Sequence, residues 1–402
     1  MPDNVLAFQW TVAGEGGFHD RKFSLRGGSI SFAAHFKIPG TGKYSISLNV
    51  VFDDGKYGEQ KATFVLRDFL IASIGDSFAS GEGNPDSNGL VHSGGWKCEA
   101  ATLSRAAEWT PDMLIEPKWV EKLAHRSLQG AHALAARSLH KASGRTLDAV
   151  GKLVTLDRVT FVSAARSGAA IPFGLLKPQT KPPGKDFIGI GQLEEIRRTV
   201  SGRRIDALLV SIGGNDLGFS SILRDLIEGD NIFTANHDND PGSVIARIDE
   251  KIAGLRNDYD HLHVAVGQLL NPKAVFVNGY PTALFDKTMP DRSIGFHACG
   301  LFQGWDLDID ASDYNLIRQK GDDLNSLIQE KVGSFPGWNF VDVAPDFIGR
   351  GYCDAHTLWV GASESCRNQG DFEGTMHPSR EGHNICAARI ASRLSLVVGG
   401  EQ

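Results

Sequence analysis

From residue 68 onward, short apolar segments alternate with longer segments that have helical spacing. Helices are expected at 119–141, 245–269 and 312–332, where apolar residues recur every three or four positions. The strand candidates are the five apolar segments 69–75, 158–165, 205–212, 273–279 and 338–343. Strands that alternate with helices form parallel sheets that helices cover on both faces. The pattern therefore predicts a doubly wound α/β domain over residues 68–402, with a five-stranded, mainly parallel sheet.

Residues 1–67 have a different pattern, which predicts a small, β-rich, sandwich-like domain. Runs such as SISFAAHFKI, KYSISLNVVF and KATFVLRDF alternate partly between apolar and polar residues, and turn sequences rich in Gly, Pro and Asp separate them. About seventy residues is small for a complete sandwich. The last of these runs leads almost directly into segment 69–75, so we expect a rigid junction without a flexible linker.

The composition is that of a globular chain without the charge of a nucleic-acid binder. Hydrophobic residues make up 41% and charged residues 22%, and 402 residues are enough for a substantial core. The net charge is -7 and the basic residues are scattered, so we expect no nucleic-acid partner. No segment reaches the roughly 18 apolar residues of a membrane-spanning helix, so we expect no stable membrane insertion. Motifs for phosphate loops, dinucleotides and zinc helices are missing, so we expect no cofactor and no metal.

Three predicted strands end in small and polar residues, and a fourth polar block lies near the C-terminus. The blocks are GDS at 75–77, ARSG at 165–168, GGND at 213–216 and TMHPSREGH at 375–383. Each block alone is a weak signal. Because the carboxyl ends of parallel strands meet at one edge of a sheet, we expect the first three blocks to lie together. A Ser, a glycine amide, an Asn amide and a His are the groups that an acyl-transfer site requires.

In these four blocks the chain resembles the SGNH hydrolases, also called GDSL-type esterases and lipases. The resemblance covers roughly residues 68–396, and the blocks occur in order and at strand ends. GDSFASGEG, VTFVSAARSGA and the Cys-flanked loop before GTMHPS are similar to the secreted acylhydrolase branch that is common in actinobacteria. The resemblance implies an SGNH/flavodoxin-like fold. It also implies hydrolysis of carboxylic esters through an acyl-enzyme, without a cofactor.

The resemblance implies a role for one residue of each block. Ser77 would be the nucleophile, and His377, whose ordinary pKa lies near neutral pH, would take the proton of the Ser77 hydroxyl. The oxyanion of the tetrahedral intermediate would be held by the backbone N–H of Ser77, the backbone N–H of Gly168 and the side-chain amide of Asn215.

The third member of a triad is left open. The family often places Asp three residues before the His, and this chain has Gly374 there. Asp371 would orient the imidazole of His377, or Glu373 would do so as a weaker candidate. A Ser-His dyad that a backbone carbonyl supports is an equally good interpretation.

Other residues near the blocks are expected to have structural roles. Asp76 and Asp216 would bond to nearby backbone groups, as Asp does in turns. His383 would pack or cap within the final helix. HRS at 125–127 resembles a family position near the site, where Arg126 would steer an anionic substrate, but a solvated Arg on the surface of the helix at 119–141 is the favoured interpretation.

The cysteines bear on location. A disulfide between Cys353 and Cys366 would close a short loop and add about 3 kcal/mol, and the alternative is two unpaired thiols. Cys386 is expected in the core of the final helix. The N-terminus shows no export signal, as would also hold for a mature secreted domain that was given a start Met. With the resemblance, the loop cysteines lead us to expect a secreted or periplasmic mature form, and a cytoplasmic location is the alternative.

The substrate, the oligomeric state and the role of residues 1–67 are not fixed by the sequence. The partner we expect is a small-molecule or lipid ester. Within the enzyme hypothesis, esterase, lipase, phospholipase and O-deacetylase of acetylated polysaccharide are all open. From another class of protein, the alternative is a non-catalytic surface or glycan-binding protein that contacts glycans through the β domain.

Overall fold

The computed structural model describes residues 5–25, 35–91, 113–142, 154–179, 189–218, 244–284, 311–352, 354 and 356–398. The chain divides into two compact units. Unit 1 comprises Met1–Phe69 and Arg137–Thr160, and unit 2 comprises Leu70–Ala136 and Phe161–Gln402. The first boundary lies two residues beyond the predicted one, but unit 1 also takes in residues 137–160, which the sequence pattern assigned to the α/β domain.

The N-terminal strands of unit 1 form one antiparallel sheet. β1 (Val5–Gly14) pairs with β2 (His19–Leu25) on one side and with β3 (Gly42–Phe52) on the other, and β3 pairs with the first part of β4 (Tyr57–Gly75). Tyr44 and Phe64 stack across β3 and β4, with ring centroids 5.3 Å apart. The described strands of this unit thus lie in one sheet and do not form the predicted sandwich. Long strands leave too few residues for a second layer.

β4 is a single strand that includes two of the predicted ones. Residues 57–66 pair with β3 in antiparallel register, and residues 71–75 pair with β8 (Ala207–Ser211) in parallel register. The segment KATFVLRDFLIASIG contains neither Pro nor Gly before its last residue, so nothing in it interrupts an extended backbone. The predicted strand at 69–75 is therefore the end of a longer strand.

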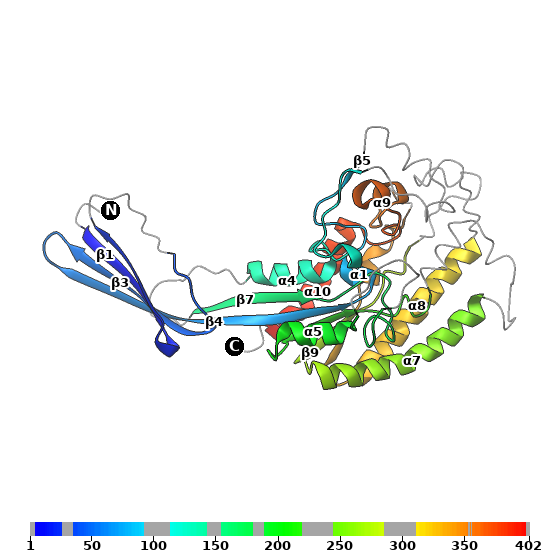
Figure 1. Cartoon of the computed structure of the whole chain (residues 1–402), viewed down its shortest axis with the longest axis horizontal. Helices are drawn as coiled ribbons and strands as arrows, with labels where there is room; N and C mark the ends of the chain where they lie inside the picture. Colours follow the sequence, from blue (N-terminus) through cyan, green and yellow to red (C-terminus); the bar gives the residue numbers. More distant parts are fainter. Residues whose placement is uncertain are drawn as a thin grey trace. The chain divides into compact units, whose positions relative to one another are not determined.

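The parallel strands of the sheet follow one another in an order that differs from their order in the sequence. β8, β9 (Ala274–Asn278) and β10 (Trp338–Val341) pair in parallel, and β7 (Val154–Ser163) pairs with β4 (Figure 1). The resulting order is β7-β4-β8-β9-β10. From β4 the chain crosses to β7 on one side, and from β7 it crosses back over β4 to β8 on the other, so the direction of the connections reverses between β4 and β8. Ligands of such sheets bind beyond the carboxyl ends of the strands at this switch point.

Helices cover both faces of this sheet. In Figure 1, α5 (Gln192–Val200) and α7 (Val244–Leu269) lie on one side, and α4 (Ala131–Ala142) lies on the other. The predicted helices at 245–269 and 312–332 match α7 and α8 (Ala311–Ser334) closely. The helix predicted at 119–141 begins only at Ala131, because residues 120–126 form a tight loop in which Arg126 N–H donates to the carbonyl oxygen of Glu121 at 3.1 Å.

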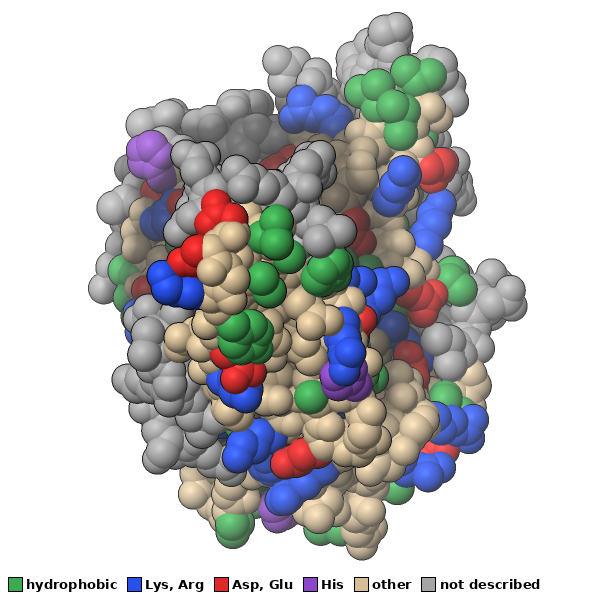
Figure 2. Space-filling model, turned by 90° about the vertical axis from the view of Figure 1, so that its left-hand side faces the viewer, with side chains coloured by type: hydrophobic (Ala, Val, Ile, Leu, Met, Phe, Trp, Pro, Cys, Tyr) green, Lys and Arg blue, Asp and Glu red, His purple; other side chains and the backbone are tan. Residues whose placement is uncertain are grey.

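The remaining elements are short, apart from the final helix. They are α1 (Ser77–Ser80), α9 (Ala362–Gln369), α10 (Arg380–Val398), β5 (Leu90–Val91), β6 (Met113–Ile115) and the 3-10 turns η1 (Glu15–Gly17), η2 (Lys122–Ala124) and η5 (Ala344–Phe347). On the face drawn in Figure 2, the described basic and acidic side chains are interspersed. None of the described helices combines the length and the hydropathy that crossing a bilayer requires.

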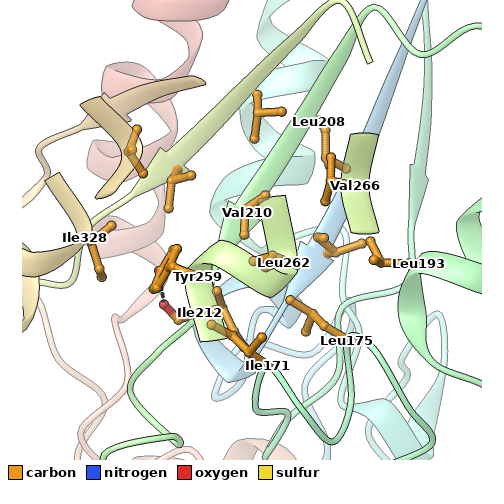
Figure 3. Close-up of a cluster of buried hydrophobic side chains, with 14 of the residues drawn as sticks. Ile171, Leu175, Leu193, Leu208, Val210, Ile212, Tyr259, Leu262, Val266 and Ile328 are labelled. Atoms are coloured by element: carbon orange, nitrogen blue, oxygen red, sulfur yellow. Dashed lines mark hydrogen bonds between the residues drawn. The ribbon is translucent and has the colours of Figure 1, made fainter. Parts of the chain in front are cut away.

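The core of unit 2 lies between the sheet and helices α5, α7 and α8. Alternate residues of each strand point into it, as the two-residue period of a strand requires. Tyr259 of α7 is fully buried in this cluster, and its hydroxyl donates to the carbonyl oxygen of Ile212 at 2.7 Å (Figure 3). This bond satisfies a buried hydroxyl and fixes the backbone where β8 ends and the block GGND begins.

Candidate active site

Ser77 is the first residue of α1, directly beyond the end of β4. Gly75 makes the turn with a φ of 141°, and a Cβ there would lie 2.1 Å from the carbonyl oxygen of Ser211. Gln192 holds both backbone groups of Gly75: its Oε1 accepts from the N–H at 2.8 Å, and its Nε2 donates to the carbonyl oxygen at 2.8 Å. Asp76 N–H donates to the carbonyl oxygen of Ser211 at 2.9 Å. The turn that presents Ser77 is therefore fixed by backbone contacts.

Asp76 is buried at the entrance to α1. Its Oδ1 caps the helix by accepting from the N–H of Phe78 at 3.0 Å, which confirms the structural role expected for it. Its Oδ2 accepts from the hydroxyl of Tyr280, and that hydroxyl accepts from the N–H of Gly214 at 3.0 Å. Burial raises the pKa of Asp76 to about 7, although the bonds from Tyr280 and Phe78 act against it. Tyr280 thus links the turn after β4 to the turn after β8.

The second and third blocks meet at the same edge of the sheet. Arg166 N–H donates to the carbonyl oxygen of Gly75 at 3.1 Å, which joins the second block to the first. Asn215 Nδ2 donates to the carbonyl oxygen of Ala169 at 2.9 Å, which joins the third block to the second. Gly168 lies between these contacts, is exposed, and has a φ of 75° that favours glycine. The structure therefore brings Ser77, Gly168 and Asn215 to one sheet edge.

The fourth block places the imidazole of His377 beside the Ser77 turn. The ring of His377 contacts the ring of Phe78, the residue after Ser77, with centroids 5.2 Å apart. Asn84 Nδ2 donates to the carbonyl oxygen of Pro378 at 2.8 Å, so the loop after α1 also holds the histidine segment. The backbone of His377 is fixed on its other side, where its carbonyl oxygen accepts from the N–H of Val360 at 2.8 Å.

The hydrogen bonding of His377 selects one tautomer. Its Nδ1 lies 3.3 Å from the carbonyl oxygen of Thr375. A carbonyl oxygen can only accept, so Nδ1 carries the hydrogen and Nε2 of the neutral ring carries the lone pair. Burial lowers the pKa of His377 below its ordinary 6.5, and the charge of Glu82 acts in the opposite direction. The ring is therefore neutral near pH 7, with Nε2 able to accept a proton.

Gly374, where the resemblance leads us to expect an acid, has no room for a side chain. A Cβ there would lie 2.6 Å from Cα of Gly83, and 2.9 Å from both Ser365 Oγ and Gln369 Oε1. Because the nearest of these atoms belongs to the backbone, it cannot turn aside as a flexible side chain would. The loop after α1 occupies the space that an Asp side chain would need.

The two other candidate acids face His125. Asp371 Oδ1 accepts from the N–H of Glu373 at 2.9 Å and from Gln369 Nε2, and its Oδ2 lies 3.8 Å from His125 Nε2. Glu373 Oε2 lies 3.8 Å from His125 Nδ1. Burial, together with the charge of Glu82, raises the pKa of Asp371 to about 6. The atom found next to Nδ1 of His377 is the carbonyl oxygen of Thr375.

His125 and Glu82 form a buried pair that sequence reasoning missed. His125 Nδ1 lies 2.8 Å from both carboxylate oxygens of Glu82, and Gln369 Nε2 donates to Glu82 Oε1 at 2.8 Å. The His125 ring also stacks on Trp119 with centroids 4.8 Å apart. Burial favours the neutral forms, but mutual attraction outweighs it: the pKa of His125 rises to about 9 and that of Glu82 falls to about 2. The only sequence signals were the Glu in GDSFASGEG and the His in HRS, which no spacing rule connects.

The donor set here does not favour a resident metal. Glu82, His125 and Glu373 have ligand atoms within 4.8 Å of one another. Glu82 is already bonded by His125 and Gln369, and a histidine must lose its extra proton before it can bind a metal. The raised pKa of His125 keeps that proton at neutral pH. The arrangement is that of an ion pair with further carboxylates beside it.

Three other expectations concern residues near the site. Arg126 is not a solvated helix residue: it precedes α4, its side chain is only 11% exposed, and its Nε donates to the carbonyl oxygen of Ala165 at 3.0 Å. His383 does cap a helix, but another one, because its Nδ1 accepts from the N–H of Ala131 at the start of α4 at 3.2 Å. Asp216 bonds to the backbone as expected, but to a residue far away in the sequence: its Oδ1 accepts from the N–H of Ile171 at 2.9 Å.

Cys366, in α9, is part of a disulfide. Its expected partner Cys353 lies outside the described residues. Cys386 is free and buried in α10, as expected for a core position.

No family model and no curated protein matches the chain. Solved structures similar to it include an extracellular lipase from Streptomyces rimosus, with 18% identity and a TM-score of 0.45 over 81% of this chain and 99% of the lipase. A family two carbohydrate esterase from Clostridium thermocellum has 12% identity and a TM-score of 0.33 over 98% and 87%. A protein assigned to the SGNH hydrolases, from Slackia heliotrinireducens, has 11% identity and a TM-score of 0.34 over 82% and 100%. The chain is thus similar to SGNH hydrolases and esterases both in its four sequence blocks and among solved structures.

Proposed function

We propose that this chain is a serine-dependent hydrolase of carboxylic esters. Ser77 Oγ attacks the ester carbonyl carbon while His377 Nε2 takes the hydroxyl proton. The tetrahedral oxyanion collapses, His377 returns the proton to the leaving alcohol, and an acyl group remains on Ser77. A water molecule, deprotonated by His377, then attacks the acyl carbon; the bond to Ser77 Oγ breaks, His377 returns the proton to that oxygen, and the acid leaves. No metal or cofactor takes part in these steps.

The observation that carries the proposal is the hydrogen bond from His377 Nδ1 to the carbonyl oxygen of Thr375. It fixes the tautomer whose Nε2 can act as a base, in a ring that packs against Phe78, next to Ser77. The same bond supports a Ser-His dyad, in which the backbone carbonyl does the orienting work of a triad acid. Asp371 is the weaker candidate for that work because its carboxylate is bonded to Gln369 and Glu373 and faces His125.

The oxyanion donors in the proposal are the N–H of Ser77, the N–H of Gly168 and the amide of Asn215. The contacts of Arg166 with Gly75 and of Asn215 with Ala169 support it, because they tie the three donor segments to one another. Preorganised donors stabilise the charge that develops on the oxygen, and the loss of one costs about 3 kcal/mol of transition-state stabilisation.

For the substrate, we propose acyl chains longer than acetyl, as in an esterase or lipase. Val120, Leu123 and Leu128 expose aliphatic side chains on the segment that carries His125. Ser127 N–H donates to the carbonyl oxygen of Ser80 in α1 at 2.8 Å, so this segment adjoins the nucleophile turn. Exposed apolar groups beside a site favour apolar chains over sugars. De-O-acetylation of a polysaccharide and non-catalytic glycan binding are the competing functions.

The test is turnover of p-nitrophenyl acetate, butyrate and octanoate, and release of acetate from acetylated xylan. We expect rates that rise with acyl length, covalent labelling of Ser77 by a fluorophosphonate, and a loss of at least about 10⁴-fold in Ser77→Ala. Ser395→Ala, a substitution of an exposed serine in α10, is the matched control and should keep full activity. Absence of turnover on every ester together with absence of labelling would overturn the proposed function.

We also propose that the protein works outside the cytoplasm. The disulfide at Cys366 supports this location, because structural disulfides persist in oxidising compartments and are rare in the cytosol.

A further inference from the structure

The proposed dyad leaves one electrostatic requirement unmet. When His377 takes the proton of Ser77 it becomes an imidazolium, and a triad acid would stabilise that positive charge with a full negative charge. The carbonyl oxygen of Thr375 carries only a partial charge, and Gly374 leaves no side chain at the usual acid position. The inference below rests on the proposed function and asks which group supplies the charge.

The loop after α1 runs alongside the histidine segment. Cα of Gly83 lies so close to Gly374 that it fills the space of a Cβ there, and Asn84 Nδ2 donates to the carbonyl oxygen of Pro378 at 2.8 Å. At the start of this loop, the N–H of Glu82 donates to the carbonyl oxygen of Ser77 at 3.1 Å. Glu82 is therefore bonded to the nucleophile residue, and the residues after it pack on both sides of His377.

The carboxylate of Glu82 is fully buried, and donors from three other segments hold it. They are His125 Nδ1, Gln369 Nε2 and the hydroxyl of Ser167, the residue before Gly168. These donors and the positive charge of His125 stabilise the ionised form of the carboxylate against the effect of burial. A permanent negative charge thus lies where the segments of the site meet.

We propose that Glu82 is a positioning residue that supplies the negative charge for the imidazolium of His377, in place of the acid that Gly374 excludes. The charge acts through space and not through a hydrogen bond to the ring. In a buried site such an interaction is screened far less than in water. The same carboxylate, through Ser167 and His125, holds the segment of the proposed oxyanion donor Gly168 against the nucleophile turn.

Other titratable groups near His377 also affect its pKa or are neutral. Glu373, on the histidine's own segment, raises the pKa of His377, as Glu82 does more strongly. His383 of α10 is neutral, because burial lowers its pKa to about 3. On the side of α1, Phe78 separates the ring from Asp76 and Tyr280.

His125 offsets part of the Glu82 charge but does not cancel it within the cluster. The four residues Glu82, His125, Asp371 and Glu373 together carry two net negative charges when the carboxylates are ionised and His125 is protonated. Asp371 and Glu373 lie 3.8 Å from the two nitrogens of His125, so they share its positive charge with Glu82. The negative field at His377 is therefore the field of the cluster, with Glu82 as its buried member.

The test is the pH profile of kcat/KM for the full chain and for Glu82→Gln, whose acid limb reports the pKa of the free-enzyme base. We expect the midpoint of the limb to move to lower pH, and kcat to fall roughly tenfold at nearly constant KM. Glu373→Gln, at a half-exposed position, should move the limb in the same direction by less. Glu364→Gln, an exposed residue on α9, is the matched control and should move nothing.

A proton NMR titration of the His377 Cε1–H, assigned with His377→Gln, measures the same pKa without turnover. An unmoved titration in folded Glu82→Gln would overturn the inference while leaving the proposed function intact. If the role of Glu82 is purely structural, Glu82→Gln should lower kcat and leave the pKa of His377 unchanged. If Glu82→Gln does not fold, the Glu373→Gln titration decides. Failure of the proposed function is distinct, because it is seen as absence of ester turnover and labelling in the wild-type chain.

Discussion

Two buried carboxylates flank the candidate nucleophile, and their charge states differ. Asp76 lies at the entrance to α1 and Glu82 lies just beyond its end. Burial raises the pKa of Asp76 to about 7, whereas the pKa of Glu82 falls to about 2 in spite of equally deep burial. The Asp76 carboxylate accepts from two neutral donors, the hydroxyl of Tyr280 and a backbone N–H, whereas the donors to the Glu82 carboxylate include the cation His125.

The difference shows that burial alone does not set the charge of a carboxylate. Desolvation raises the pKa of both residues, and at Glu82 the charge and hydrogen bond of His125, together with the hydroxyl of Ser167, outweigh it. The serine turn therefore has a carboxyl group before it that can be neutral, Asp76, which caps α1 and bonds to Tyr280. It also has a carboxylate after it that is permanently charged, Glu82. Glu82, on the charged side, begins the loop after α1, and the following residues of this loop pack against the His377 segment.

The largest effect on stability should come from neutralising the charged side. Glu82→Gln leaves His125 buried beside two half-exposed acids, and we expect the free energy of unfolding to fall by about 3 kcal/mol. Asp76→Asn keeps the cap acceptor and loses only the partner of the Tyr280 hydroxyl, so we expect about 1 kcal/mol. Urea unfolding of both variants at pH 5, where both carboxylates still contribute stability, measures the difference. Equal losses would contradict the contrast between the two carboxylates.

A smaller effect should follow from crowding the loop that carries Glu82. Gly374→Ala forces a Cβ against Cα of Gly83, so we expect a loss of about 2 kcal/mol in the free energy of unfolding. Gly333→Ala, in α8, is the matched control: its Cβ would meet nothing within 4 Å, and a helical Ala is favoured over Gly by up to about 1 kcal/mol. Thermal unfolding should therefore give opposite signs. A stabilising Gly374→Ala would show that the loop can move away.

The smallest effect is the pH dependence of the stability that His125 and Glu82 contribute. The raised pKa of His125 means that the stability it contributes is complete below pH 6.5 and is lost as pH rises through about 9. The lowered pKa of Glu82 means that its contribution is complete above pH 4.5 and is lost as pH falls through about 2. The stability difference between wild type and Glu82→Gln should thus be largest from pH 4.5 to 6.5 and shrink toward pH 9.

Asp76 should show the opposite dependence, which urea unfolding at several pH values can detect. Its raised pKa means that the stability it contributes is complete below pH 3.8 and is lost as pH rises through about 7. The difference between wild type and Asp76→Asn should therefore shrink between pH 4 and 7, where that for Glu82→Gln stays near its maximum. Parallel curves for the two variants would refute the assigned charge states.

The sequence predicted the parts of the site that follow the ends of strands. Three blocks at strand ends were enough to predict that Ser77, Gly168 and Asn215 lie on one edge, because parallel strands of one sheet share their carboxyl ends. Arg126 was misjudged because helical spacing continued through a segment that folds as a loop before α4. The pair of Glu82 and His125 was missed because it joins two segments whose approach depends on tertiary packing. The local periodicity of the sequence does not predict contacts between segments that are distant in the sequence.

Gln192 makes two hydrogen bonds to the backbone of Gly75, the last residue of β4. One primary amide offers a donor and an acceptor side by side, as a peptide group of a neighbouring strand would, so Gln192 acts as a one-residue substitute strand. The strand end is as fully paired as its middle and has little tendency to fray. A shorter Asn would not reach, and a Glu would lack the donor that Gly75 needs. The side chain of a helix thus completes the sheet where the chain turns toward Ser77.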